Sequence, residues 1–148
     1  MLKKLSTTKK AYIAGFLDGD GSIYVRAKPN PSYRYGFQIA PYVVLFQSQK
    51  DQENFAKVCE PIGYGKTRVR KDGILEYSIN KIDDIKEFLE CVYPFVILKK
   101  EQIELMLKII EQKKNVESAN DFKILLESVD SFRNLNYSKK RKKRTLTP

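Results

Sequence analysis

Two aspartates separated by one glycine, Asp18 and Asp20, are the residues of this sequence whose type and spacing best suit chemistry. They stand at the end of an apolar stretch, and no basic residue is adjacent to either of them. Carboxylates gathered in this way are costly unless they coordinate a cation, and oxygen ligands select hard cations. We therefore expect a divalent metal here, Mg²⁺ or else Mn²⁺ or another divalent cation.

Two simpler interpretations compete with a metal site. The run from Asp18 resembles the start of a calcium-binding EF-hand loop, but that pattern requires glycine and glutamate where Ile23 and Pro29 stand. Alternatively, Asp18 only caps and Asp20 only forms a turn. We expect the capping role for Asp18 and metal binding for Asp20.

The absence of certain residues narrows the possible chemistry. The sequence contains no histidine, which excludes histidine general bases, histidine-containing triads and histidine-ligated zinc. Its two cysteines, Cys59 and Cys91, form no Cys-x-x-Cys pair and are expected to be buried thiols in a reducing compartment. A catalytic site must therefore use carboxylate, amide, lysine or backbone groups.

The helix that carries the aspartates, predicted over about residues 7–18, is apolar on all sides. A helix of this kind is buried all round, and a stripe of small residues lets another backbone approach closely. In a chain of 148 residues, the natural partner is the same helix of a second subunit, related by a two-fold axis. The sequence predicts a homodimer with Asp20 of both subunits near that axis. The predicted interface residues are Ala11, Ala14, Gly15 and Asp18.

Hydrophobic periodicity and turn residues predict an α+β domain in which two antiparallel hairpins form one sheet and helices cover a single face. We expect one domain over residues 1–138, followed by a basic tail at 139–148. The predicted strands are 22–28, 37–48, 65–70 and 74–79, and the later helices begin near 51, 83, 100 and 121.

The uncovered face of this sheet carries polar and basic side chains at every second position, so each set lies on one face. A solvated charged face is one interpretation, and a surface that reads DNA is the one we favour. A strand of about eight residues spans roughly 26 Å, so two such sheets would cover about sixteen to twenty base pairs. The predicted DNA-binding residues of the sheet and its first loop are Tyr24, Arg26, Lys28, Asn30, Ser32, Lys66, Arg68, Arg70, Glu76 and Ser78.

The formal net charge of +10 points to a polyanionic partner, in the first place nucleic acid. No apolar run has the length of a membrane span, and the N-terminus lacks the apolar stretch of a signal peptide. We expect an intracellular protein that is not secreted and has no membrane partner. Six consecutive basic residues at 139–144 would bind phosphates of the DNA backbone. Alternatively, they form a disordered segment that increases solubility, or a nuclear localisation signal.

The nine residues Ile13–Gly21 resemble the LAGLIDADG motif, with apolar substitutions and Gly19 in place of alanine. The predicted αββαββα order and the basic strands strengthen the resemblance, which extends over nearly the whole chain. The chain is most similar to the single-motif homing endonucleases encoded in ribosomal RNA introns, of the algal chloroplast type. Further resemblance lies in 19–23, 28–30, 62–63, Arg68, Arg70, 98–99 and 108–112.

This resemblance implies a homodimeric enzyme that initiates intron homing. It would hydrolyse both strands of a long, near-palindromic double-stranded DNA site across the minor groove, leaving short 3′ overhangs. The resemblance also implies that Asp20 ligates the catalytic metals, with the carbonyl of Gly19 nearby. An organelle, either chloroplast or mitochondrion, and the archaeal cytoplasm both fit as its location.

The resemblance implies roles for further residues. The supporting catalytic glutamine looks like Gln49, with Gln47 as the rival, and the catalytic basic residue looks like Lys99, with Lys100 as the rival. The glutamine would orient solvent without ionising, and the lysine would stabilise developing negative charge. Residues that resemble the family's phosphate contacts are Ser138, Lys139 and Lys142.

Two other functions keep the same scaffold. Some members of the family are RNA maturases that help their host intron to splice, and a basic sheet can hold RNA. A DNA-binding regulator without chemistry is a third possibility. An intact Asp20 favours cleavage over both, although it is compatible with a second role in splicing.

Overall fold

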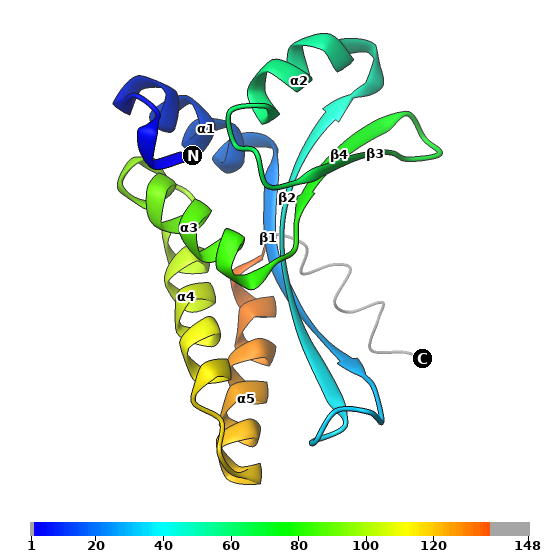
Figure 1. Ribbon diagram of the computed structural model, residues 1–148, viewed down its shortest axis with the longest axis vertical. Coiled ribbons are helices and arrows are strands. Elements are labelled where there is room, and N and C mark those ends of the chain that lie inside the picture. The colour runs from blue at the N-terminus through cyan, green and yellow to red at the C-terminus, as the bar shows by residue number, and fades with distance from the viewer. Residues whose placement is uncertain (1, 137–148) are drawn as a thin grey trace. The chain divides into compact units, whose positions relative to one another are not determined.

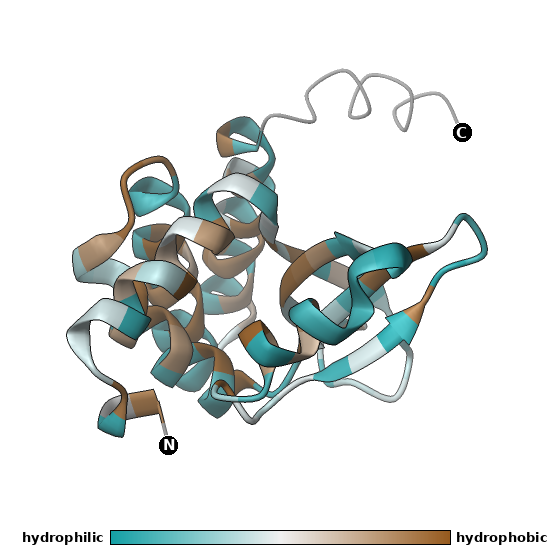
Figure 2. Ribbon diagram, turned by 90° about the horizontal axis from the view of Figure 1, so that it is seen from above, coloured by the Kyte–Doolittle hydropathy of each residue, from teal (hydrophilic) through white to brown (hydrophobic). Residues whose placement is uncertain are grey.

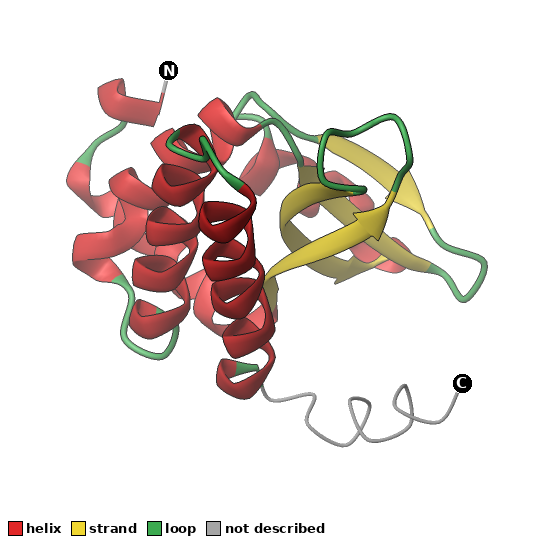
Figure 3. Cartoon of the chain, turned by 90° about the horizontal axis from the view of Figure 1, so that it is seen from below, coloured by secondary structure: helices red, strands yellow, loops and turns green. Residues whose placement is uncertain are grey.

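The computed structural model describes residues 2–136, in which four strands form a single sheet in the order β1-β2-β4-β3 (Figure 1). Figure 3 shows the combination of helices and strands that makes this an α+β fold, as the sequence predicted. The strands are β1 (Gly21–Pro29), β2 (Phe37–Ser48), β3 (Lys66–Val69) and β4 (Ile74–Ile79). The helices are α1 (Thr7–Asp20), α2 (Gln52–Cys59), α3 (Ile82–Val92), α4 (Lys100–Lys114) and α5 (Ala119–Leu135). Short 3-10 turns are η1 (Leu2–Lys4), η2 (Gln49–Asp51) and η3 (Tyr93–Phe95).

The described chain divides into two compact units, each made of segments that are distant in sequence. Residues 2–23 and 41–100 form the first unit, and residues 24–40 and 101–136 form the second. Because both units are discontinuous, neither corresponds to a separate stretch of chain. The single domain over residues 1–138 stays a prediction.

The core of the first unit explains why its strands and helices form where they do. In β4 every second residue is buried, namely Leu75, Tyr77 and Ile79, so one face of the strand is apolar. Helix α1 contacts α3 and η3, and it buries Ile13 and Leu17. The helices show both hydrophobic and hydrophilic stretches (Figure 2), as expected for elements that are buried on one side.

The second unit is built around two helices. α4 and α5 bury apolar residues at helical spacing, among them Ile103, Met106, Leu125 and Phe132. The side-chain amide of Gln102 donates a hydrogen bond to the carbonyl oxygen of Leu135 at 3.0 Å and thereby ties the start of α4 to the end of α5. In the same unit, the ring of Tyr35 stacks on Phe122 with 5.0 Å between ring centroids.

Local capping and turn residues set the ends of the elements. The Ser6 side chain accepts a hydrogen bond from the Lys9 amide at the start of α1. The turn between β3 and β4 places Gly73 at a φ of 81°, which favours glycine. α1 continues to Asp20, two residues beyond its predicted end. Gly19 does not interrupt the helix, and the backbone N–H of Gly21 still donates to the carbonyl oxygen of Leu17.

The two cysteines are free thiols. Cys59 is buried, as the sequence predicted, and burial raises its pKa to about 12. Cys91 is only half-buried, so the prediction of a buried thiol was wrong for this residue. Its position on α3 lies outside the stripe that packs into the core, which comprises Ile85, Phe88, Leu89 and Val92.

Candidate active site and nucleic-acid interface

The Asp18 carboxylate is committed to the backbone of the segment that precedes α4. One of its oxygens accepts hydrogen bonds from the amides of Ile97 at 2.6 Å and Leu98 at 3.0 Å. The other oxygen accepts a bond from the Lys99 amide at 3.2 Å. These bonds fix the backbone of three residues that precede α4, so Asp18 anchors a segment distant in sequence, while the predicted capping role stays a prediction.

Asp20 differs from Asp18 in being exposed at the last position of α1. Within residues 2–136, its carboxylate accepts no hydrogen bond and forms no ion pair. Gly19 is exposed as well, and a β-carbon placed there would meet no other atom within 4 Å. The exposed carboxylate of Asp20 is therefore accessible to a cation.

The donor set of one chain is small for a metal ion. Among residues 2–136, no three or more histidine, cysteine, aspartate or glutamate side chains gather into a group that could hold a metal. Mg²⁺ commonly binds through one or two carboxylates and completes its shell with waters and substrate phosphates. The exposed Asp20 fits such a site as one carboxylate ligand.

Lys99 lies beside the two aspartates and is 7% exposed. Its ammonium donates a hydrogen bond to the backbone carbonyl of Asp18 at 2.9 Å. Burial lowers the pKa of Lys99, while the nearby negative charges of Asp18 and Asp20 act in the opposite direction. The alternative, Lys100, donates a hydrogen bond to the backbone carbonyl of Tyr93 at 3.1 Å. Its ammonium lies 4.3 Å from the centre of the Tyr93 ring. The geometry thus favours Lys99 as the basic residue near Asp20.

The two candidate glutamines occupy different environments. Gln49 is exposed at the start of η2, and its backbone N–H donates to the Gly73 carbonyl oxygen at 2.8 Å. Gln47 is half-buried in β2 opposite Leu75, and its side-chain oxygen accepts a bond from the Ser48 amide at 2.8 Å. Neither contact involves Asp20, so the choice of Gln49 stays a prediction and Gln47 stays its rival.

The exposed side of α1 differs from the predicted dimer stripe at one position. Ala14 is fully buried within its own chain and cannot contact a partner, so its assignment to the interface was wrong. Ala11 and Gly15 are exposed as predicted, and a β-carbon at Gly15 would meet nothing within 4 Å. Gly19 continues this exposed stripe one turn later.

Four large apolar side chains are exposed on the described part of the first unit, Val69 on β3 among them at 48%, and sequence reasoning missed all of them. Tyr12 is 63% exposed on α1, while Ile97 and Leu98 are 81% and 57% exposed in the segment bound by Asp18. Ile97 and Leu98 are adjacent in sequence, and exposed apolar side chains that lie together mark an interaction surface. Their spacing gave no signal, because Val96–Leu98 reads as a core segment.

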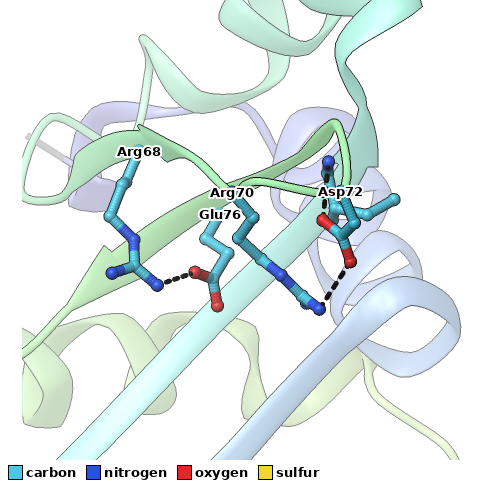
Figure 4. Close-up of polar contacts among 5 residues, drawn as sticks. Arg68, Arg70, Asp72 and Glu76 are labelled. Carbon is cyan, nitrogen blue, oxygen red and sulfur yellow. Dashed lines mark hydrogen bonds and ion pairs between the residues drawn. The ribbon is translucent and has the colours of Figure 1, made fainter.

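The hairpin of β3 and β4 presents the polar face that the sequence predicted. Arg68 pairs with Glu76 and Lys66 with Ser78 in the antiparallel register, so these four side chains share one face. The guanidinium of Arg68 donates to Glu76 at 2.5 Å (Figure 4). Every residue from Lys66 to Arg70 is exposed, as a nucleic-acid interface requires.

Strand β1 and the loop after it belong to the second unit from Tyr24 onward. Arg26 is exposed, while Tyr24 and Lys28 are half-buried. In the loop, the Asn30 side-chain oxygen accepts hydrogen bonds from the Ser32 amide at 3.0 Å and the Ser32 hydroxyl at 2.7 Å. Asn30 and Ser32 therefore shape the loop, and their predicted base contacts stay untested.

Other exposed groups in this loop were missed from the sequence. Tyr33 is 42% exposed, and Arg34 is exposed with its guanidinium 5.3 Å from the centre of the Tyr35 ring. An aromatic ring and a guanidinium at a loop tip suit contacts with nucleic acid. The signal was present in the sequence as Tyr33-Arg34-Tyr35, beside the polar residues that were chosen instead.

Three of the predicted DNA-binding residues lie outside the part of the chain that the structure describes. Ser138, Lys139 and Lys142 lie outside the described residues, so their phosphate contacts stay predictions. None of the described helices has the length and apolar character needed to cross a membrane.

Comparison with known proteins gives concordant results. The LAGLIDADG endonuclease family matches residues 13–110. The chain is 38% identical over 132 residues to DNA endonuclease I-CreI of Chlamydomonas reinhardtii, which covers 88% of this chain and 80% of that protein. It is 29% identical over 120 residues to DNA endonuclease I-CvuI of Chlorella vulgaris, covering 81% and 73% of the two chains.

Solved structures agree with the sequence matches. The homing endonuclease I-CvuI in complex with its target, in the presence of calcium, superposes with a TM-score of 0.81 at 26% identity, over 88% of this chain and 83% of that one. The archaeal intron-encoded homing endonuclease I-Vdi141I, complexed with DNA, shares the fold with a TM-score of 0.77 at 23% identity, covering 87% and 84%. The motif at the end of α1, the sheet and these matches together show that the chain belongs to the LAGLIDADG endonuclease family and is a site-specific DNA endonuclease.

Proposed function

We propose that this endonuclease works as a homodimer that cuts both strands of a long, near-palindromic DNA site with divalent metal ions, Mg²⁺ in the first place. One observation carries the proposal. Of the two motif aspartates, Asp18 is bound to three backbone amides, whereas Asp20 is exposed, has no hydrogen-bond partner among the described residues and lies near the Lys99 ammonium. A metal-binding carboxylate must be accessible in this way.

The homodimer is supported by the exposed side of α1. Ala11, Gly15 and Gly19 leave room for a second backbone, as close packing of two helices about a two-fold axis requires. Beside them, residues of α1 and α2 line a groove of about 460 Å³, into which Tyr12 and Val58 contribute apolar surface. Docking of a second copy would cover this surface and bring a second Asp20 toward the first.

The chemistry is divided between the metal and the protein. A metal held by Asp20, with the Gly19 carbonyl nearby, would lower the pKa of a bound water and neutralise phosphate charge. Lys99 would stabilise the negative charge that develops on the phosphodiester, and its burial strengthens its field at close range. Gln49, or its rival Gln47, would orient the attacking water without ionising.

Recognition would be carried out by the exposed face of the sheet. Arg68 and Arg70 on the β3–β4 hairpin have the side chain that most often reads guanine in the major groove. The basic tail would add phosphate contacts that are independent of sequence. Two such surfaces related by a two-fold axis read a near-palindrome, and cutting across the minor groove between them would leave short 3′ overhangs.

The biological role follows from the resemblance to intron-encoded relatives. I-Vdi141I is an archaeal intron-encoded homing endonuclease, and we propose the same role of initiating intron homing for this chain. The matches are to endonucleases and do not favour the RNA maturase alternative. An organelle and an archaeal cytoplasm remain the two proposed locations.

The decisive experiment replaces Asp20 with asparagine. Asp20→Asn keeps the shape of the side chain and removes the charge that binds the metal, so cleavage of both strands should be abolished while DNA affinity is retained or rises. A gel-shift titration and a cleavage time course are run on the same duplex, with and without Mg²⁺. Asp83→Asn, an equivalent change at an exposed position on α3, should cut normally. Near-normal cutting by Asp20→Asn would refute the metal site, and loss of binding would make Asp20 a structural residue.

A further inference from the structure

The turn between β3 and β4 contains an ion pair that the recognition scheme above does not use. One guanidinium nitrogen of Arg70 donates to a carboxylate oxygen of Asp72 at 2.8 Å (Figure 4). The other carboxylate oxygen of Asp72 accepts a hydrogen bond from the Ile74 amide at 3.2 Å. Asp72 therefore joins the arginine to the backbone of the turn.

The backbone hydrogen bonds of the turn fix the position of Asp72. The Arg70 amide donates to the Ile74 carbonyl at 2.8 Å, and the Gly73 amide donates to the Arg70 carbonyl at 3.1 Å. Gly73 adopts a φ of 81°, so the backbone after Asp72 holds a conformation that other residues rarely take. A carboxylate held at such a point restricts the guanidinium that binds to it.

This pair contributes little to the stability of the fold. The side chains of Arg70 and Asp72 are 40% and 52% exposed, and ion pairs at such exposure add little to folding. The main consequence of the pair is that it restricts the rotamers of Arg70, because a free arginine side chain samples many rotamers. Arg68 is bound to Glu76 on the neighbouring strand in a comparable way, so both arginines of the hairpin are restrained by carboxylates.

We propose that Asp72 is a positioning residue that makes Arg70 read a base edge instead of binding the nearest phosphate. The inference rests on the proposed DNA-reading role of this hairpin. Asp72 occupies one of the five N–H donors of the guanidinium and leaves the remaining donors for a second acceptor. The O6 and N7 atoms of guanine are the acceptors that match this planar group.

The charge of Asp72 acts in the same direction. A carboxylate 2.8 Å from the guanidinium offsets part of the positive charge that would attract a phosphate, and its own negative charge repels the phosphate. A neutral base edge suffers no such repulsion. Asp72 thus lowers the affinity for random-sequence DNA more than the affinity for the target site. The difference between the two affinities, and with it the sequence specificity, increases.

The test is Asp72→Asn in the full-length chain. Asparagine keeps the side-chain oxygen that accepts from Ile74 and removes the charge that restrains Arg70. We expect tighter binding to random-sequence duplex and a dependence on salt that is steeper by about one unit. Preference at one base pair of each half-site should fall about three- to tenfold. Glu90→Gln, which changes the net charge equally at an exposed position on α3, should leave base preference unchanged.

A double-mutant cycle shows whether Asp72 acts through Arg70. If it does, Asp72→Asn should not alter base preference in an Arg70→Ala background. An equal change in both backgrounds would overturn the inference, because Asp72 would then act through the turn. If Arg70→Ala relaxes base preference and Asp72→Asn does not, the positioning role alone fails. If Arg70→Ala leaves base preference intact, the assignment of the hairpin as a base-reading surface fails with it.

Discussion

Replacing Asp18 with asparagine would separate the structural aspartate from Asp20, which we propose as the metal ligand. The carboxylate receives three backbone N–H groups, from Ile97, Leu98 and Lys99. Asparagine has a single acceptor oxygen. Its side-chain NH₂ group replaces the other carboxylate oxygen and therefore faces at least one of the three backbone N–H groups. The variant must therefore lose at least one of these bonds and place two donors against each other.

The magnitude follows from these contacts. A hydrogen bond to a charged group contributes about 1.5–3 kcal/mol, and a donor left without a partner adds its own cost. Because Asp18 is only partly buried, we expect a loss of about 2–3 kcal/mol in the free energy of unfolding. For a chain of this length, that corresponds to a decrease in Tm of about 5–10 °C.

The assay is thermal unfolding of Asp18→Asn beside Asp20→Asn and a control. Asp130→Asn makes the same chemical change at an exposed position on α5 and should alter stability by less than about 0.5 kcal/mol. Asp20→Asn should resemble the control, because no fold contact depends on its carboxylate in residues 2–136. An Asp18→Asn variant as stable as Asp130→Asn would refute the argument that Asp18 anchors the segment before α4.

The remaining predictions use established assays. Gly15→Leu should shift the chain from dimer to monomer in sedimentation, and a wild-type chain that is monomeric at micromolar concentration, with and without DNA, would contradict the two-fold arrangement. Lys99→Met should slow cleavage about 10²–10³-fold while leaving affinity in a gel shift unchanged. Arg68→Ala or Arg70→Ala should cost about 1–3 kcal/mol on the target and relax one base pair per half-site, whereas equal losses on random DNA would refute direct reading. Lys142→Ala in the tail should weaken binding to every sequence and lower the salt slope by about one.

Most of the fold was predictable because strong local signals mark its boundaries. β2 begins at Phe37 and ends at Ser48, as predicted, because turn-forming residues precede it and a polar run follows it. The Asp72-Gly73 turn located the second hairpin, since glycine is required where φ is positive. Side-chain alternation then placed Arg68 and Glu76 on one face, which the strand register confirms.

The stripe on α1 was harder to predict because periodicity does not tell which partner a small residue meets. Ala14 and Gly15 are neighbours in sequence and both are small, yet Ala14 is fully buried in its own chain and Gly15 is exposed. The contacts of α1 with α3 and η3 decide this, and they join segments about seventy residues apart. Local patterns carry no information about such contacts.

The exposed pair Ile97 and Leu98 was missed for a related reason. An apolar run normally indicates core, and Val96 in the same run is buried. The Asp18 carboxylate binds the amides of both residues, which fixes the backbone of the segment while their side chains remain 81% and 57% exposed. Only knowledge of the bond from Asp18, across nearly eighty residues of sequence, would have revealed this.

The spacing of the two motif aspartates has a physical explanation in these contacts. Residues two apart on a helix point roughly 200° away from each other, so two such carboxylates cannot serve the same neighbour. Asp18 binds the chain before α4, and its backbone carbonyl holds the Lys99 ammonium, whereas Asp20 is left exposed. Because Asp18 also binds the Lys99 amide, it fixes this lysine at two points next to the carboxylate that we propose as the metal ligand. The intervening Gly19 is exposed as well, so within three residues the motif holds one aspartate bound to the backbone and one that is accessible to a cation.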